Sequence, residues 1–282
     1  MKIDAHQFFW KYEKGIFNNK GISNVDVLKN DFLPHDSLVD LVNNDISGCI
    51  AIQNYKSDDE THALLDLSND YDFIQGVVGW IDLENPKIGQ KINYYKDKKV
   101  VAFRDNFNDI EDAFYPLKKE VIRGLELIHE YKIPFEFRSS IQQFPSILDL
   151  MYLREGQTFI LNDMGFLPPS RNSWHSWEIM LRAASQNPNV YCKINGVFKL
   201  RVKFGYSDED LKHLLLTLYD VFGADRLIFG SDWPYLKLNG SYQELIAFIK
   251  ECYKDLKSTD LDLIFGENAE KIYLDSRKKK AN

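Results

Sequence analysis

This sequence has few cysteines, no long hydrophobic run and no excess of positive charge. The three cysteines, Cys49, Cys192 and Cys252, lie far apart without C-x-x-C spacing, which favours buried reduced thiols over a disulfide framework or a zinc clip. No run approaches the roughly 20 apolar residues that a membrane-spanning helix needs, so we predict no membrane association. At 44% hydrophobic and 14% aromatic residues, the chain can still bury a large core.

The charge balance argues against a general nucleic-acid surface. The formal charge is −7 and the only strongly basic run lies at residues 277–280, whereas binding to phosphates requires a basic stripe. The first residues enter an apolar strand pattern directly, without the basic and apolar regions of a secretory signal. We therefore expect a cytoplasmic protein whose partner is a small molecule, and the sequence indicates no particular oligomeric state.

Short apolar runs alternate with longer amphipathic ones along the chain. Eight runs rich in β-branched and aromatic residues are typical of parallel strands, and they lie at 2–6, 48–53, 73–81, 100–104, 134–138, 158–162, 190–194 and 226–230. Helical patterns fill the intervals at 37–42, 61–67, 87–95, 117–131, 145–153, 177–185, 211–222 and 242–256. This alternation predicts an α/β fold of the (β/α)8 TIM-barrel type. A doubly wound open sheet is less favoured because no glycine-rich phosphate turn follows the first strand.

No linker rich in proline, glycine or serine divides the chain, which predicts one barrel domain at 1–276 and a solvated basic tail at 277–282. Residues 57–60 and 207–210 have the form of capping boxes, and Gly223 is placed to end the helix that follows the second. Two long connections, at 9–30 and 166–173, follow the first and sixth strands, and such loops usually form lids or pocket walls.

Polar residues stand at the carboxyl end of every predicted strand. These ends meet at one rim of a parallel barrel, where barrel enzymes place their chemistry, and the residues are His6, Gln53, Asp82, Arg104, Arg138, Asp163, Lys193 and Asp232. His6 and Asp232 should be neighbours there, because the first and last strands of a closed barrel pair with each other.

Individual members of this set have simpler interpretations. Asp82 is more readily explained as a turn or cap acceptor, and Asp105 is a ready partner for Arg104. Lys193 lies in an apolar strand, so its ammonium must find an anion, either a carboxylate or a substrate. Trp10, after the first strand, is predicted either to stack on a ligand or to plug the barrel mouth with its aromatic neighbours.

Several segments, taken in order, resemble the amidohydrolase-2 family, and more closely its branch of metal-dependent hydrolases that includes sugar-acid lactonases. The most specific are Gly-Trp-Ile-Asp-Leu at 79–83 and Phe-Gly-Ser-Asp-Trp-Pro at 229–234, and the others lie at 3–7, 31–34, 190–194 and 266–269. The resemblance covers essentially the whole chain. It implies a TIM-like barrel that hydrolyses small cyclic esters.

Two positions depart from the pattern of that family. Its usual His-x-His on the first strand is matched by His6 and Phe8, and its usual histidine after the sixth strand is matched by Asp163. Its aspartate after the eighth strand, a catalytic base or metal ligand, is present as Asp232. The remaining metal set, His6, Asp163 and Asp232, is incomplete for zinc, so no cofactor is favoured and a single divalent ion such as zinc stays an alternative.

The first hypothesis for function is a lactonase-like hydrolase acting on a sugar-acid or carboxylate-bearing ring ester. Asp232 is the general base, His6 is the second catalytic residue, and the predicted substrate-binding residues are Arg104, Arg138, Lys193, Asp163, Gln53 and Trp10. Two alternatives remain open. One is a hydrolase or decarboxylase that binds one metal, and the other is a barrel that binds a ligand without catalysis.

Overall fold

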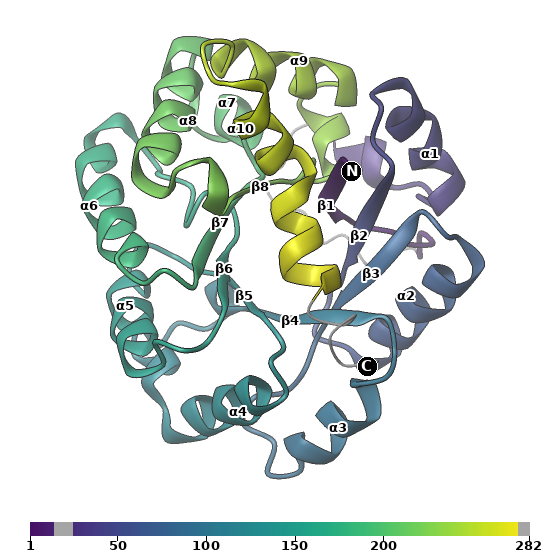
Figure 1. Cartoon of the computed structure of the whole chain (residues 1–282), viewed down its shortest axis with the longest axis vertical. Coiled ribbons are helices and arrows are strands. Elements are labelled where there is room, and N and C mark those ends of the chain that lie inside the picture. The colour runs from purple at the N-terminus through teal and green to yellow at the C-terminus, as the bar shows by residue number, and fades with distance from the viewer. Residues whose placement is uncertain (14–24, 276–282) are drawn as a thin grey trace.

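The computed structural model describes residues 1–13 and 25–275, and within them eight parallel strands form one sheet in the order of the chain, β1 to β8 (Figure 1). The strands are β1 (Ile3–Gln7), β2 (Gly48–Ile52), β3 (Ile74–Gly79), β4 (Val100–Asn106), β5 (Phe135–Arg138), β6 (Phe159–Leu161), β7 (Val190–Ile194) and β8 (Leu227–Phe229). The TIM-type α/β barrel predicted from the sequence is confirmed. Each strand lies within about two residues of its predicted place.

The barrel closes where the segment after β8 meets β1. Asp232 N donates to His6 O at 3.0 Å, and Phe8 N donates to Trp233 O at 2.8 Å. The buried carboxylate of Asp4 strengthens this seam, because it accepts hydrogen bonds from Ser231 N at 2.9 Å and from the Tyr242 hydroxyl at 3.1 Å. This closure places His6 beside Asp232, as the sequence predicted.

Helices surround the strands (Figure 1). They are α1 (Pro34–Asn43), α2 (Asp58–Asp70), α3 (Ile88–Tyr95), α4 (Lys119–Glu130), α5 (Phe144–Leu153), α6 (Trp174–Ser185), α7 (Lys199–Phe204), α8 (Asp208–Phe222), α9 (Tyr242–Cys252) and α10 (Ser258–Asp262). Short 3-10 turns lie at Val25–Leu28, Phe107–Asp109, Tyr115–Leu117, Arg171–Ser173, Ala224–Arg226 and Tyr235–Leu238. Helices α7 and α10 were not predicted from the sequence. No helix of the described residues is long and apolar enough to cross a membrane.

One of the two predicted capping boxes forms. Ser207 accepts from Asp210 N and the Asp210 carboxylate accepts from Ser207 N, and Gly223 ends α8 with φ +67°. At the start of α2, Ser57 accepts from Glu60 N, but the Glu60 carboxylate turns to the backbone N–H groups of Asn54 and Tyr55. Glu60 thus braces the loop after β2 and not the helix terminus.

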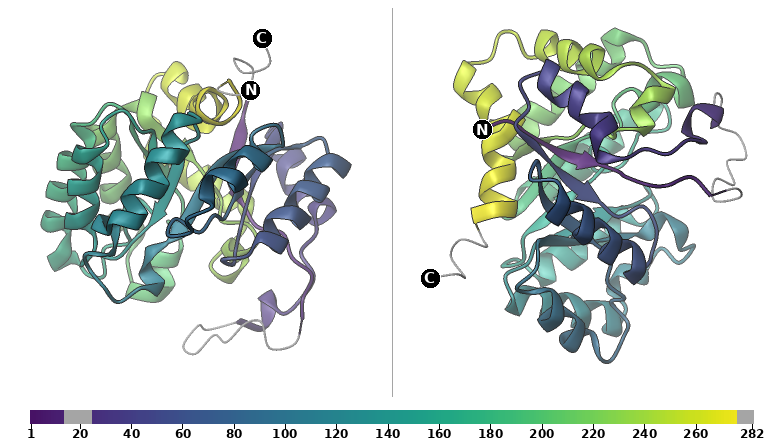
Figure 2. Two further views of the ribbon diagram at one scale, coloured as in Figure 1. Left: turned by 90° about the horizontal axis from the view of Figure 1, so that it is seen from below. Right: turned by 90° about the vertical axis from the view of Figure 1, so that its right-hand side faces the viewer.

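A C-terminal helical run lies across the centre of the barrel in the view of Figure 1, beside the N-terminus, as Figure 2 shows. It begins with α10 and continues in π-helical turns at Leu263–Glu267 and Glu270–Leu274. Its Tyr273 hydroxyl reaches a β5 side chain inside the barrel, donating to Glu136 Oε1 at 2.6 Å. The run therefore covers the amino end of the strands and leaves the carboxyl end as the open face. The predicted basic tail at 277–282 lies outside the described residues.

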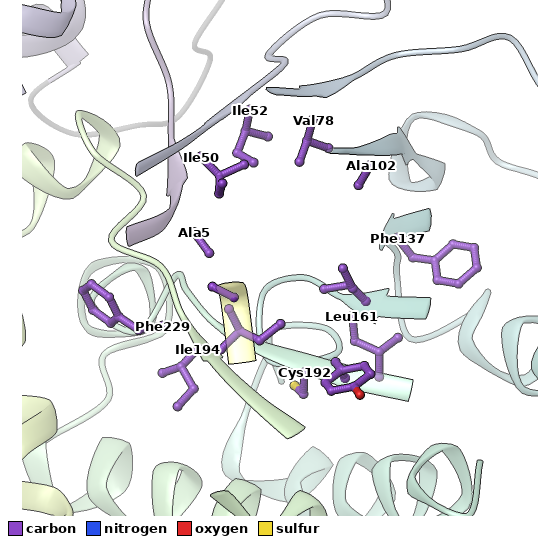
Figure 3. Packing of buried hydrophobic residues seen from close by; sticks show 14 of the residues in the cluster. Ala5, Ile50, Ile52, Val78, Ala102, Phe137, Leu161, Cys192, Ile194 and Phe229 are labelled. Atoms are coloured by element: carbon purple, nitrogen blue, oxygen red, sulfur yellow. The ribbon is translucent and has the colours of Figure 1, made fainter. Parts of the chain in front are cut away.

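Every strand contributes buried apolar side chains to the core of the barrel. Figure 3 labels fully buried examples from all eight strands, namely Ala5, Ile50, Ile52, Val78, Ala102, Phe137, Leu161, Cys192, Ile194 and Phe229. Successive residues of a strand point to opposite faces, so the neighbours of each of these residues point to the other face of the sheet. The cysteines are free and buried, as predicted.

Candidate active site

A cavity of about 650 Å³ opens at the carboxyl ends of the strands. Six of the residues predicted for the site line it, namely His6, Gln53, Arg104, Arg138, Asp163 and Asp232. The cations Lys56, Lys199 and Lys203 also line it, and with Arg104 and Arg138 they outnumber the lining carboxylates Asp109, Asp163 and Asp232. The cavity is therefore suited to a polar or anionic molecule.

His6 and Asp232 lie at the base of this cavity, almost fully buried. Nε2 of His6 is 3.3 Å from Oδ1 of Asp232, and Asn195 Nδ2 donates to the same oxygen at 3.1 Å. Lys199 Nζ lies 2.8 Å from Oδ2 in an ion pair, and no other group of the described residues donates to that oxygen. Asp232 has φ +61°, in the left-handed region that few non-glycine residues adopt.

The protonation state of His6 depends on Lys193, which contacts the ring nitrogen Nδ1. Lys193 Nζ lies 3.3 Å from Nδ1, and because an ammonium can only donate, we assign the proton of the neutral ring to Nε2, facing Asp232. Burial lowers the pKa of His6 well below its usual value, and the positive charges of Lys193 and Arg104 lower it further. The ring of His6 is therefore neutral.

Lys193 itself is buried inside the barrel. Its ammonium donates to Glu136 Oε1 at 2.9 Å, to Glu136 Oε2 at 3.0 Å and to Ala5 O at 3.0 Å. Glu136 also accepts from the Tyr273 hydroxyl. These contacts join β1, β5 and β7 with the C-terminal run, so the anion that Lys193 requires is a carboxylate of the protein.

Asp163 is the most heavily paired carboxylate of the cavity. Arg138 Nε donates to Oδ2 at 2.6 Å, Asn195 Nδ2 donates to Oδ1 at 2.8 Å, and Lys199 Nζ lies 3.6 Å from Oδ1. Burial alone would raise the pKa of Asp163, but the charges of Lys199 and Arg138 outweigh burial and hold that pKa below its usual range. Asp163 is thus an anion already committed to protein partners.

Arg104 and Gln53 line the cavity, and each has one buried polar atom that lacks a partner in the described part of the chain. Arg104 Nη1 donates to Gln53 O at 3.1 Å, while Arg104 Nε and Gln53 Oε1 are buried without a hydrogen-bond partner among the described residues. Asp105, the expected partner of Arg104, pairs instead with Lys56 at 2.8 Å. Buried polar atoms rarely stay unsatisfied, so this donor and this acceptor are suited to a bound molecule.

Aromatic side chains form one wall. The Phe8 ring stands edge-on to the His6 ring, with 5.0 Å between the ring centroids, and also edge-on to Tyr235 at 5.2 Å. The Tyr235 hydroxyl donates to Asn54 Oδ1 at 2.9 Å, which ties the segment after β8 to the loop after β2. Phe8 therefore fills the space beside His6 with apolar volume.

Two predicted substrate-binding residues need correction, because the structure places them outside the cavity lining. Lys193 is fully buried beneath His6, where its ammonium forms an ion pair with Glu136. Trp10 packs on Phe32 and donates from its indole nitrogen to Asn30 O at 3.1 Å, away from the cavity. Asp82, interpreted as a turn acceptor, accepts from Glu84 N at 3.0 Å and does not line the cavity.

Four residues at or beneath the site were not predicted from the sequence, namely Lys199, Asn195, Glu136 and Tyr235. Asn195 and Glu136 had a usable signal, because each lies two residues from a predicted site residue and so shares its face of the strand. Lys199 had no such signal. It begins the short helix α7, and only the path of the chain after β7 returns that helix to the cavity.

The side chains at the site do not fit a divalent metal ion. Phe8 offers no donor, Asp163 is paired with Arg138 and Asp232 with Lys199. Within residues 1–13 and 25–275, no group of three or more His, Cys, Asp or Glu side chains is arranged to hold a metal. A zinc site at His6, Asp163 and Asp232 would require these ion pairs to open.

Comparisons with known proteins give the chain a family. The family model described as amidohydrolase matches residues 3–274. The chain is similar to an L-fucono-1,5-lactonase of Burkholderia multivorans, with 28% identity over 286 residues that cover 97% of this chain and 96% of the relative. It is also similar to a crystal structure of an amidohydrolase from Burkholderia multivorans with bound zinc, at 25% identity and a TM-score of 0.89, covering 97% of this chain and 99% of that chain. Because the family model spans almost the whole barrel, the chain belongs to the amidohydrolase family of enzymes.

Proposed function

We propose that this protein hydrolyses a small lactone with Asp232 as the general base. The observation that carries the proposal is the carboxylate of Asp232, which lines a cationic cavity and whose Oδ2 has no partner among the described residues other than the ammonium of Lys199. Relatives named L-fucono-1,5-lactonase at 28% and 24% identity over nearly the whole chain support a ring ester as the substrate.

In this proposal Asp232 takes a proton from a water molecule while the oxygen of that water attacks the lactone carbonyl carbon. Asn195 Nδ2 donates to the other carboxylate oxygen, His6 Nε2 lies 3.3 Å from that same oxygen, and together they hold Asp232 in orientation. The ring C–O bond then breaks, the leaving alkoxide takes the proton from Asp232, and a hydroxy acid results that ionises at neutral pH. General-base catalysis of this kind contributes about 10² to 10⁴ in rate.

The negative charge that develops on the carbonyl oxygen needs a donor. Arg104 meets this need best among the guanidinium groups, because it lines the cavity without an ion-pair partner among the described residues, whereas Arg138 is bound to Asp163. One such preorganised donor is worth about 3 kcal/mol of barrier. Gln53 Oε1, also unpartnered, is suited to accept from a substrate hydroxyl.

The test is turnover of a panel of aldono-1,4- and 1,5-lactones, with L-fucono-1,5-lactone included, followed by proton release in weak buffer. We expect turnover of at least one neutral or acidic sugar lactone well above spontaneous hydrolysis. Folded Asp232→Asn protein is the matched blank. The proposal is overturned if the wild type hydrolyses no lactone faster than this blank does.

A further inference from the structure

Asp163 and Asp232, from the ends of two different strands, are held side by side. The side-chain nitrogen Nδ2 of Asn195 donates to both, at 2.8 Å to Asp163 Oδ1 and 3.1 Å to Asp232 Oδ1. Both aspartates have a positive φ, of +51° and +61°. The space around them is tight, because a Cβ on the intervening Gly196 would lie 3.0 Å from Asp163 Oδ1 and 3.6 Å from Asp232 Oδ2. Two buried carboxylates this close repel each other unless a cation lies beside them or one of them binds a proton.

Lys199 supplies that cation. Its Nζ lies 2.8 Å from Asp232 Oδ2 and 3.6 Å from Asp163 Oδ1, and its side chain is 26% exposed where it lines the cavity. With Arg138 on the far side of Asp163, two positive charges balance two negative ones. We propose that the ammonium of Lys199 is a built-in substitute for a divalent metal ion, holding the two carboxylates together and facing the substrate.

The neighbouring side chains agree with this assignment. A metal ion between Asp163 and Asp232 would have to displace the ammonium, and Phe8 beside His6 provides no ligand in compensation. The balance of charge points the same way, because a dication added to the existing pair of cations would leave the site with excess positive charge. Lys199 and a metal ion are therefore expected to exclude each other.

An ammonium that replaces a metal ion at this position would also take part in the reaction. This part of the inference rests on the proposed lactone hydrolysis. An ammonium on a flexible four-carbon stem carries three hydrogens, so it can remain near Asp232 while donating a hydrogen bond to the carbonyl oxygen of the substrate. It would share the developing negative charge with Arg104. Lys199 is then a catalytic residue that touches the reacting carbonyl group.

Zinc affinity provides a test that does not depend on any activity. Lys199→Ala and Lys199→Met, the second of which preserves side-chain bulk, should bind Zn²⁺ at least tenfold more tightly than the wild type by calorimetry. Lys199→Arg, which keeps the charge, should not. Asp232→Asn introduced into the Lys199→Ala protein should abolish the gain, because it removes a ligand.

Lys203 provides the matched control. It is on the same helix and lines the same cavity, but no carboxylate of the described residues lies within ion-pair distance of its ammonium. Lys203→Ala should therefore leave zinc affinity unchanged. The inference is overturned if folded Lys199→Ala and Lys199→Met proteins bind zinc no better than the wild type, or if Lys203→Ala produces the same gain.

Activity supplies the second arm. With a lactone that the wild type hydrolyses, Lys199→Ala should lower kcat at least 100-fold, and methylammonium at tens of millimolar should restore part of the loss. Asp232→Asn should show no such rescue. If the wild type turns over no lactone, the proposed function fails. The zinc experiment still decides whether the Lys199 ammonium takes the place of a metal ion. Full activity of Lys199→Ala alongside a zinc gain would overturn the catalytic role alone.

Discussion

The ammonium of Lys193 lies 2.9 Å from Oε1 and 3.0 Å from Oε2 of Glu136, and both side chains are completely buried inside the barrel. Glu136 has one further donor, the hydroxyl of Tyr273. The pair joins two strands that are not neighbours, and it also places a positive charge under Nδ1 of His6. Its contributions to stability and to the site can be separated by mutation.

We expect Lys193→Met to destabilise the protein by about 3–5 kcal/mol, because it leaves the Glu136 carboxylate buried without its counter-ion. Adding Glu136→Gln should recover a large part of this loss, since the amide is neutral and still accepts from Tyr273. Urea unfolding of the two variants measures the difference. A single variant as stable as the wild type would contradict the role given to the ion pair.

Asp232→Asn should retain the fold and lower lactone turnover by at least about two orders of magnitude, because an amide does not accept a proton from water. Thermal unfolding checks the fold, and initial rates on the substrate found in the panel check the activity. Near-normal turnover by the folded variant would remove Asp232 from the mechanism.

His6 should remain a neutral ring protonated on Nε2 at pH 6, because burial and the nearby cations depress its pKa. In the folded state it then resists protonation, so its contribution to stability is present above pH 6.5 and declines as the unfolded state takes up a proton at lower pH. Nitrogen-15 NMR of labelled histidine, assigned with His6→Gln, measures the tautomer. Lys193→Met should shift that signal, which a purely structural role of Lys193 would leave in place.

Glu60 should make stability fall as pH rises. Burial raises the pKa of Glu60 to about 7, so the folded state binds more protons than the unfolded state between about pH 4.5 and 7, and the stability is lost through that window. The shift corresponds to about 3 kcal/mol, which solvent screening of this partly exposed carboxyl reduces to about 1–2 kcal/mol.

The variant Glu60→Gln measures this effect as the difference from the wild type in the free energy of unfolding at pH 5 and at pH 8. The difference should favour the variant at pH 8. Glu155→Gln, at an exposed carboxyl, serves as the control and should follow the wild type. Parallel pH curves for Glu60→Gln and the wild type would show that Glu60 does not titrate in this window.

The sequence by itself determined the barrel and the rim of the site. Alternating strand and helix patterns give parallel strands, and the carboxyl ends of parallel strands meet at one face, so the convergence of His6, Arg104, Arg138, Asp163 and Asp232 followed from local pattern and topology alone. The presence of Phe8 where the family usually has a histidine was also evident from the sequence, because it depends only on which residue occupies that position.

Only the tertiary structure decided how the charges are paired. The direction of a side chain along a strand is local, but its partner comes from across the barrel, as Glu136 does for Lys193. Lys199 reaches Asp232 only because α7 folds back over the cavity, and Lys56 takes Asp105 so that Arg104 stays available to a ligand. Electrostatic energy depends on distances of a few ångströms between residues remote in sequence, and those distances are fixed only when the barrel closes.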